Sequence, residues 1–193
     1  MPNTVPGVRC VVPRVSPIQS RDQVKPEDQA VFDTVAAVRG TVRGPSSIVL
    51  NSPALAAEHV HLSRFFMSGT QVQQRELELA VCATAREKDC RYVWAAHVAG
   101  ARKVGIGEAT IAAVRDRGPV AGLDATEAAV ITYVRQLLRE NRVEQGVFDQ
   151  LQKQFGAAWL VELTALVGHY GYLAGILNAF ELLPAADAEQ LPV

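Results

Sequence analysis

The chain has 193 residues, of which 49% are hydrophobic and 20% are charged, and its formal net charge is −1. This length supports a hydrophobic core without disulfides or metals, and the composition excludes a disordered or fibrous chain. Because a net charge this close to zero attracts neither phosphate backbones nor anionic membranes, we expect no nucleic-acid partner and no membrane partner.

The composition of residues 1–25 predicts an extended arm that lies over the surface or against a neighbouring subunit. The segment MPNTVPGVRCVVPRVSP is rich in proline, valine and arginine, and its prolines interrupt the apolar core that a signal peptide needs. It contains Cys10, one of three cysteines, and an odd number without framework spacing is typical of a reducing compartment. We therefore expect a cytoplasmic protein whose folded domain spans residues 26–193.

Residues 25–40 and 51–69 predict the first two helices. In both segments a proline stands at a first-turn position and a glycine ends the helix. In the second helix, the apolar spacing predicts that the chain buries Leu55, Leu62 and Phe66.

Six further helices are predicted over residues 73–88, 90–105, 107–118, 124–140, 144–156 and 159–180. Asp124 and Glu127 have the spacing of a capping box at the start of one of them. Strand signals are nearly absent, since SIVLN (47–51) is too short and isolated to build a sheet. We therefore predict an all-α, single-domain bundle of about eight helices.

The last predicted helix has the length and the apolar composition of a membrane span. WLVELTALVGHYGYLAGILNAF is long enough to cross a bilayer. It contains Glu162, His169 and Asn178, and a span would hold the acid only at a cost of a few kcal/mol. We interpret the segment as a central helix buried by its own domain. His169 is then a satisfied core histidine, with a second pocket residue as the alternative.

Glu78 is the first candidate for chemistry. It stands at the head of LAVCATA (79–85), an apolar run that predicts a helix buried on nearly every side. A carboxyl group at such a place is partly desolvated, which favours its use in proton transfer. The alternative is a structural carboxylate that pairs with Arg75 or Arg86 at the rim of the core.

The segment DCRYVWAAH adds a cysteine and a histidine. Cys90 follows an aspartate that we expect to cap its helix, and in the first turn the helix dipole stabilises a thiolate. His97 lies on nearly the same face, but about 10 Å further along the axis, which is too far for a direct thiol–imidazole hydrogen bond. Tyr92 and Trp94 would wall a pocket, although aromatic residues at helical spacing usually pack in the core.

The joint spacing of these residues resembles the carboxymuconolactone decarboxylase and AhpD-like alkylhydroperoxidase superfamily. Twelve positions separate Glu78 from Cys90, and seven more lead to His97. The resemblance extends to RGPSSIVLNSPAL, RELELAVCATARE, YVWAAHVAGARKVG and LVELTALVGHYGYLAGILNAFE, so it covers roughly residues 40–183. It is strongest to the longer members with a Tyr-x-Trp-x-x-His signature. It implies an AhpD-like helical fold and a homo-oligomer.

The hydroperoxidase branch implies a glutamate, a Cys-x-x-Cys pair and a histidine that relay protons to a redox dithiol. Glu78, Cys90 and His97 occupy three of these places, but Val93 replaces the second cysteine and Tyr92 replaces the auxiliary histidine. In that branch the second cysteine attacks the peroxide. The motif therefore offers no two-cysteine cycle, and a redox enzyme would depend on Cys90 alone with an external thiol.

The decarboxylase branch implies only the glutamate and the histidine, nineteen residues apart as Glu78 and His97 are, and no thiol, metal or cofactor. In its chemistry a proton moves while a small lactone or keto acid loses its carboxylate. A cation such as Arg86 or Arg91 would hold that carboxylate.

Three functions stay open. The leading hypothesis is a cofactor-independent small-molecule enzyme in which Glu78 and His97 exchange protons with the substrate, in a pocket lined by Cys90, Tyr92 and Trp94. The second is a one-cysteine peroxidase or thiol oxidoreductase that uses Cys90. The third is a helical, oligomeric ligand-binding protein without turnover.

Overall fold

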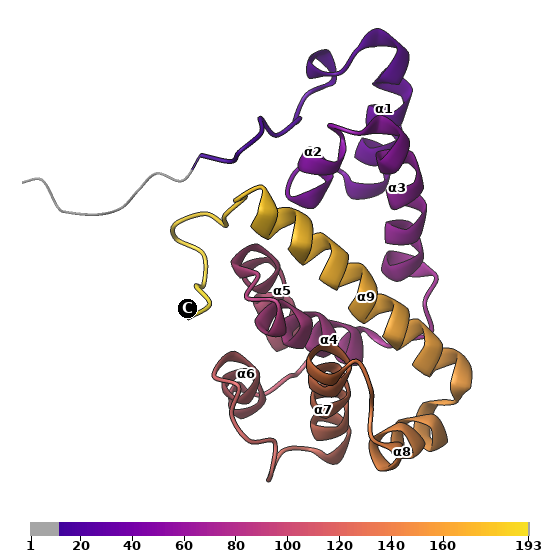
Figure 1. Ribbon diagram of the computed structural model, residues 1–193, viewed down its shortest axis with the longest axis vertical. Helices are drawn as coiled ribbons and strands as arrows, with labels where there is room; N and C mark the ends of the chain where they lie inside the picture. The colour runs from indigo at the N-terminus through magenta and orange to yellow at the C-terminus, as the bar shows by residue number, and fades with distance from the viewer. Residues whose placement is uncertain (1–11, 193) are drawn as a thin grey trace, which may run out of the picture.

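The computed structural model describes residues 12–192, which contain nine α-helices and two short 3-10 helices, Arg21–Gln23 and Pro26–Asp28, and no strand (Figure 1). The α-helices are α1 (Gln29–Arg39), α2 (Pro45–Val49), α3 (Pro53–Ser68), α4 (Gln74–Glu87), α5 (Arg91–Lys103), α6 (Glu108–Arg115), α7 (Ala125–Glu140), α8 (Gln145–Phe155) and α9 (Ala157–Ala179). The predicted all-α class is confirmed. The SIVLN segment, which was expected to form no sheet, contributes to the single turn of α2.

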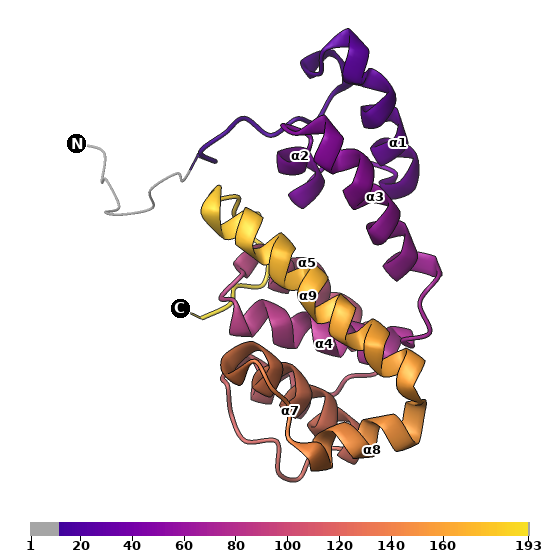
Figure 2. The ribbon, with the colours of Figure 1, turned by 45° about the vertical axis from the view of Figure 1, so that its right-hand side comes forward.

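The long helix α9 runs diagonally across the molecule. Figures 1 and 2 show α1, α2 and α3 on one side of it and the helices from α4 to α8 on the other. Within the described chain, α9 is the helix that is long and apolar enough to cross a membrane. It packs against α2, α4, α5 and α8, and it buries Trp159, Leu163 and Leu166. It therefore forms the central helix of the bundle.

The main core is built around α4, which contacts α5, α6, α7 and α9. Every residue of α4 from Leu77 to Arg86 is buried, in agreement with the prediction of a helix enclosed on nearly every side. Most of this run is apolar, so the helix gains stability from burial on all its faces. Glu78 lies near the start of this enclosed run.

A second, smaller core lies between α1, α2 and α3. The prediction for α3 is partly wrong: Phe66 is buried, but Leu55 and Leu62 are each 45% exposed. The reason is the direction of the buried face, which carries Ala56 and Val60 toward α1, whereas the two leucines lie to one side of that face.

Residues 12–25 form the described part of the predicted arm, which is not extended throughout, because it contains the 3-10 helix Arg21–Gln23. The Arg14 N–H donates to the carbonyl of Phe180, and the Arg14 guanidinium pairs with Glu181 at 2.6 Å. The Ile18 N–H donates to the carbonyl of Ser47. The arm therefore lies over the end of α9 and over α2. Cys10 lies outside the described residues.

The start of α7 shows which part of the expected capping box forms. The Asp124 carboxylate accepts hydrogen bonds from the N–H groups of Thr126 and Glu127, as an N-cap should. The Glu127 side chain does not return to the cap. It pairs with Arg75 at 2.6 Å and accepts a hydrogen bond from Thr110, because it is buried between α4 and α6.

Candidate functional site

Glu78 on α4 and His97 on α5 meet where these two helices pack together. The His97 Nδ1 atom lies 2.9 Å from Glu78 Oε2. The other carboxylate oxygen, Oε1, accepts a hydrogen bond of 2.9 Å from the Gln74 side-chain amide, one turn earlier on α4. Glu78 is 8% exposed, so both of its oxygens are held in a nearly closed environment.

Gly100 makes this close approach of the two helices possible. It stands on α5 three residues after His97, and a Cβ atom there would lie only 3.1 Å from Glu78 Cδ and Oε1. That distance is tighter than ordinary van der Waals contact, so any larger residue would push the carboxylate away. Glycine is therefore part of the geometry of the pair, although it lowers helix propensity.

The two ion-pair partners that the structural alternative gave to Glu78 are wrong. Its two expected partners are engaged elsewhere, since Arg75 pairs with Glu127 and Arg86 pairs with Asp89, each at 2.6 Å. The partner that Glu78 has instead is His97, whose charge depends on pH.

His97 lines two neighbouring cavities. The first has a volume of about 190 Å³ and includes Arg43 and Tyr92 in its lining. The second has a volume of about 270 Å³ and includes Glu78 and His169. Arg39, His97 and Tyr170 line both cavities and so form the wall that they share.

Two arginines give the first cavity a positive charge. Arg39 and Arg43 both line it, and neither forms an ion pair with a carboxylate of residues 12–192. Among the described residues, the one hydrogen-bond contact of the Arg39 guanidinium is with the sulfur of Met67, at 3.8 Å. Guanidinium groups without an acidic partner are suited to bind a carboxylate.

Tyr92 lies in the first cavity, as the sequence predicts. The backbone of the loop before α2 reaches its ring at Gly44, which has φ +59°. A Cβ atom at this glycine would lie 2.8 Å from the tyrosine hydroxyl oxygen. Burial raises the pKa of Tyr92, and the charge of Arg43 lowers it in part, which puts this arginine close to the ring.

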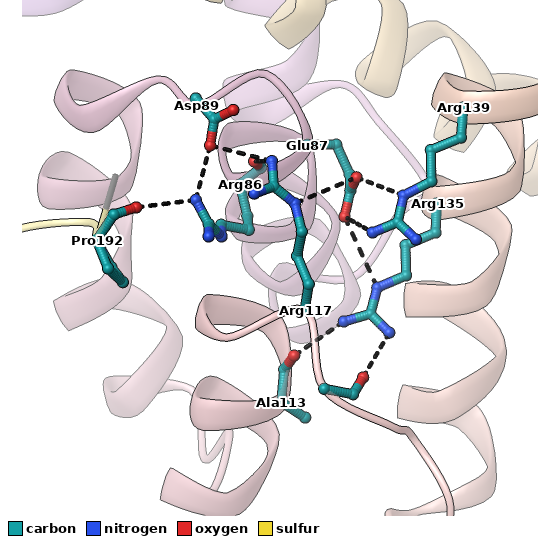
Figure 3. A network of polar contacts seen from close by, with 9 residues as sticks. Arg86, Glu87, Asp89, Ala113, Arg117, Arg135, Arg139 and Pro192 are labelled. Atoms are coloured by element: carbon teal, nitrogen blue, oxygen red, sulfur yellow. Dashed lines mark hydrogen bonds and ion pairs between the residues drawn. The ribbon is translucent and has the colours of Figure 1, made fainter.

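Trp94 and Arg86 were expected to bind substrate, and neither lines the two cavities. Trp94 is fully buried in the core, and its indole N–H has no hydrogen-bond partner in the part of the chain that the structure describes. Arg86 lies at the other end of α4 from Glu78, eight residues or about 12 Å along the axis. There it donates to Asp89 and to the carbonyl of Pro192, and so holds the C-terminal segment (Figure 3).

Cys90 is closed off from both cavities. It is the N-cap of α5 and is 0% exposed. Burial raises the pKa of its thiol, which opposes the thiolate that a nucleophile needs. The expected cap, Asp89, instead has φ +47° and binds Arg86. Burial also raises the pKa of Cys82, so neither thiol has the environment of a reactive cysteine.

His169 is not the satisfied core histidine that we expected. It lines the second cavity and stacks on His59, with the ring centroids 5.5 Å apart. The Nδ1 atoms of both rings are buried without a hydrogen-bond partner within residues 12–192. Burial lowers the pKa of each to about 4, so both imidazoles are neutral near pH 7.

Sequence reasoning missed four residues of the site. Gln74 had a detectable signal, because it precedes Glu78 by four residues on the same helix. Arg39 and Arg43 flank a glycine-containing loop, and no local pattern indicates where this loop packs. Tyr170 follows His169 in an apolar helix, and the sequence does not indicate which face of that helix the tyrosine occupies.

Comparisons with known proteins agree with this fold. Residues 57–134, which contain Glu78, Cys90 and His97, match the carboxymuconolactone decarboxylase family. An uncharacterized peroxidase-related protein from Silicibacter sp. TM1040 superposes with a TM-score of 0.68 at 18% identity, over 93% of each chain. The debrominase Bmp8, in its apo form, gives a TM-score of 0.65 at 16% identity, over 88% of this chain and 91% of that chain. At these identities the likeness shows the fold alone. No curated protein sequence matches the chain.

Proposed function

Since the chain contains a carboxymuconolactone decarboxylase family domain at residues 57–134, we propose that it is a cofactor-independent enzyme that decarboxylates a small lactone or keto acid. The observation that carries the proposal is the hydrogen bond between Glu78, which lines the second cavity, and His97, which lines both cavities. An acid and an imidazole in contact suffice for proton transfer to a bound substrate.

The pair divides the work of proton transfer. The Gln74 amide donates to the Glu78 carboxylate, so this carboxylate acts as an acceptor and orients His97 through the Nδ1–H group. That leaves the Nε2 atom of His97 as the nitrogen that exchanges a proton with the substrate. Glu78 stabilises the imidazolium by its negative charge, as the carboxylate of a catalytic triad does.

The reaction balances without a cofactor. The C–C bond to the carboxylate breaks, carbon dioxide leaves, and the electron pair stays on the substrate. The His97 imidazolium then donates its proton to carbon, and solvent returns a proton to the ring. The net change is the replacement of a carboxylate by a hydrogen atom.

The charge and size of the first cavity support an anionic, small substrate. Arg39 and Arg43 supply two guanidinium groups for a carboxylate, the role that sequence reasoning gave to Arg86. A volume of about 190 Å³ lies below the usual range for drug-sized ligands, so a single small ring suits it. Nothing in the surroundings of Cys90 favours the one-cysteine peroxidase, because its thiol is sealed from this space.

The test is an assay of the full chain with carboxymuconolactone and with small β-keto acids, following the release of carbon dioxide. We expect His97→Ala to lower kcat/KM by on the order of a hundredfold or more. Arg39→Met and Arg43→Met should chiefly raise KM, since they remove binding of the carboxylate. His61→Ala, exposed on α3, is the control. Turnover that survives His97→Ala, or no turnover by the native chain, would overturn the proposal.

A further inference from the structure

Tyr170 on α9 stands beside His97 in the wall between the two cavities. Its ring is perpendicular to that of His97, with the centroids 5.2 Å apart. Because both side chains line both cavities, a substrate that reaches the imidazole from either side also meets the tyrosine.

The Tyr170 hydroxyl has no hydrogen-bond partner within residues 12–192, whereas the hydroxyl of Tyr133 lies 2.6 Å from Thr164 Oγ1. Buried tyrosine hydroxyls nearly always have such a partner. Among residues 12–192, the unpartnered polar atoms that are sealed from solvent belong to other residues, and Tyr170 lines both cavities, so this hydroxyl is accessible from them. A polar group that is accessible, unpartnered and on a cavity wall is placed for a bound ligand.

This hydroxyl is a hydrogen-bond donor at neutral pH. Burial raises the pKa of Tyr170 to about 12; the charge of Arg39 opposes this shift, and the charge of Glu78 adds to it. The phenol therefore keeps its proton and can donate to an oxygen that becomes negatively charged.

We propose that Tyr170 is a catalytic residue that donates a hydrogen bond to the substrate carbonyl oxygen on which negative charge develops. The inference rests on the proposed decarboxylation and narrows the substrate to acids whose carboxylate is β to, or conjugated with, a carbonyl group. When the C–C bond breaks, its electron pair moves into that carbonyl and forms an enolate, and carbon dioxide leaves. The enolate collapses when the His97 imidazolium protonates carbon.

During the reaction the negative charge moves from the carboxylate to the carbonyl oxygen, so the two arginines alone do not stabilise it in the transition state. Arg39 and Arg43 can pair with the carboxylate, but this group loses its charge as it becomes carbon dioxide. The charge appears on the carbonyl oxygen at the other end of the reacting unit. A donor that stabilises the transition state more than the bound substrate must face that oxygen.

The experiment compares Tyr170→Phe, which removes only the hydroxyl, with Tyr172→Phe, its matched control two residues further along α9. In turnover of carboxymuconolactone, we expect Tyr170→Phe to lower kcat by on the order of tenfold to a hundredfold with little change in KM. Tyr172→Phe should leave both constants at the native values. Unchanged turnover by Tyr170→Phe would overturn the inference while leaving the proposed function intact.

A binding measurement separates the two claims. At a pH where 4-nitrophenol is ionised, we expect Tyr170→Phe to bind its phenolate about tenfold more weakly, and to bind neutral 4-nitrotoluene as the native chain does. If no chain turns over the lactone but phenolate binding still depends on Tyr170, the proposed function fails and the donor assignment stands.

The native chain keeps the inference testable if Tyr170→Phe does not fold. A preference for the phenolate over 4-nitrotoluene that persists in Arg39→Met supports a donor other than this arginine. Equal binding of the two probes by the native chain would overturn the assignment.

Discussion

Two buried glutamates at opposite ends of α4 have different surroundings. Glu87 has a side chain that is 5% exposed, and three arginines surround it: Arg139 at 2.6 Å, and Arg117 and Arg135 at 3.8 Å (Figure 3). Glu78 has a side chain that is 11% exposed, and no permanently charged group is among its partners in the described chain.

The difference indicates which acid has a structural role. A carboxylate held by several fixed positive charges stays ionised and links α4 to the helices that carry the arginines. A carboxylate whose partner is an imidazole beside a cavity has the arrangement that general acid–base catalysis uses. Under the proposed function, the identity of the partner, more than burial, distinguishes Glu78 from the structural acid Glu87.

The largest expected effect is on the rate, in Glu78→Gln. The amide keeps the size of the side chain but cannot stabilise the imidazolium of His97, so we expect kcat to fall by on the order of a hundredfold. Thermal unfolding should stay near that of the native chain. A large loss of stability at native activity would make Glu78 a structural acid like Glu87.

Glu87→Gln should do the opposite. Removing the negative charge leaves Arg117, Arg135 and Arg139 facing one another, and we expect a loss of about 2–3 kcal/mol in the free energy of unfolding. This loss is smaller than most losses measured when a buried ion pair is broken, because Arg139 is 44% exposed and solvent screens its charge. Urea denaturation measures the effect, and kcat of the folded variant should equal that of the native chain.

The histidines extend the comparison to acid pH. His59 and His169 have no acidic partner in the described chain, and burial lowers the pKa of each from 6.5 to about 4. Between these values the unfolded chain binds the protons that the native chain does not, so the native chain loses stability as pH falls from 6.5 to 4.

Replacing His169 by Gln removes one of the two groups that bind a proton in the unfolded chain but not in the native chain. The decrease in the free energy of unfolding between pH 6.5 and pH 4 should become smaller by about 2 kcal/mol. Urea denaturation across this range measures it. His61→Gln, exposed on the same helix as His59, should keep the full decrease. If both variants show the same pH dependence, the buried imidazoles are not the cause.

The smallest effect is expected for Gly100→Ala, which disturbs the geometry of the Glu78–His97 pair without lowering the stability of the fold. Gly100→Ala favours the helix but places a Cβ 3.1 Å from the Glu78 carboxylate, so we expect about a tenfold loss of kcat without a lower melting temperature. Gly175→Ala on α9 is the control, since a Cβ there has nothing within 4 Å. It should raise stability and leave kcat unchanged. An unaltered rate in Gly100→Ala would show that the pair tolerates displacement.

The sequence was most informative where the signal is local. The ends of α1, α3 and α7 followed from caps and glycines, although Asp89 is not the cap of α5, and the enclosure of α4 followed from an uninterrupted apolar run. The burial of Leu55 and Leu62 was wrong, because spacing defines a stripe on a helix but not which stripe the neighbouring helix covers.

The site required contacts between distant segments. The spacing of Glu78 and His97 followed a family pattern, but their mutual orientation depends on the packing of α4 on α5 and on the small size of Gly100. Arg39 and Tyr170 reach the cavities from α1 and α9, and no local periodicity encodes such convergence. Trp94 and Arg86 have the residue types of a binding site, yet they point into the core and toward the C-terminal segment.

The most direct test of the central claim is a double-mutant cycle on the decarboxylation rate, with Glu78→Gln, His97→Ala and the double variant. If Glu78 acts only through His97, the double variant should be no slower than His97→Ala alone, because a residue that acts through another has nothing left to assist. Losses that multiply in the double variant would contradict the account, since the two side chains would then act independently of the 2.9 Å hydrogen bond that joins them.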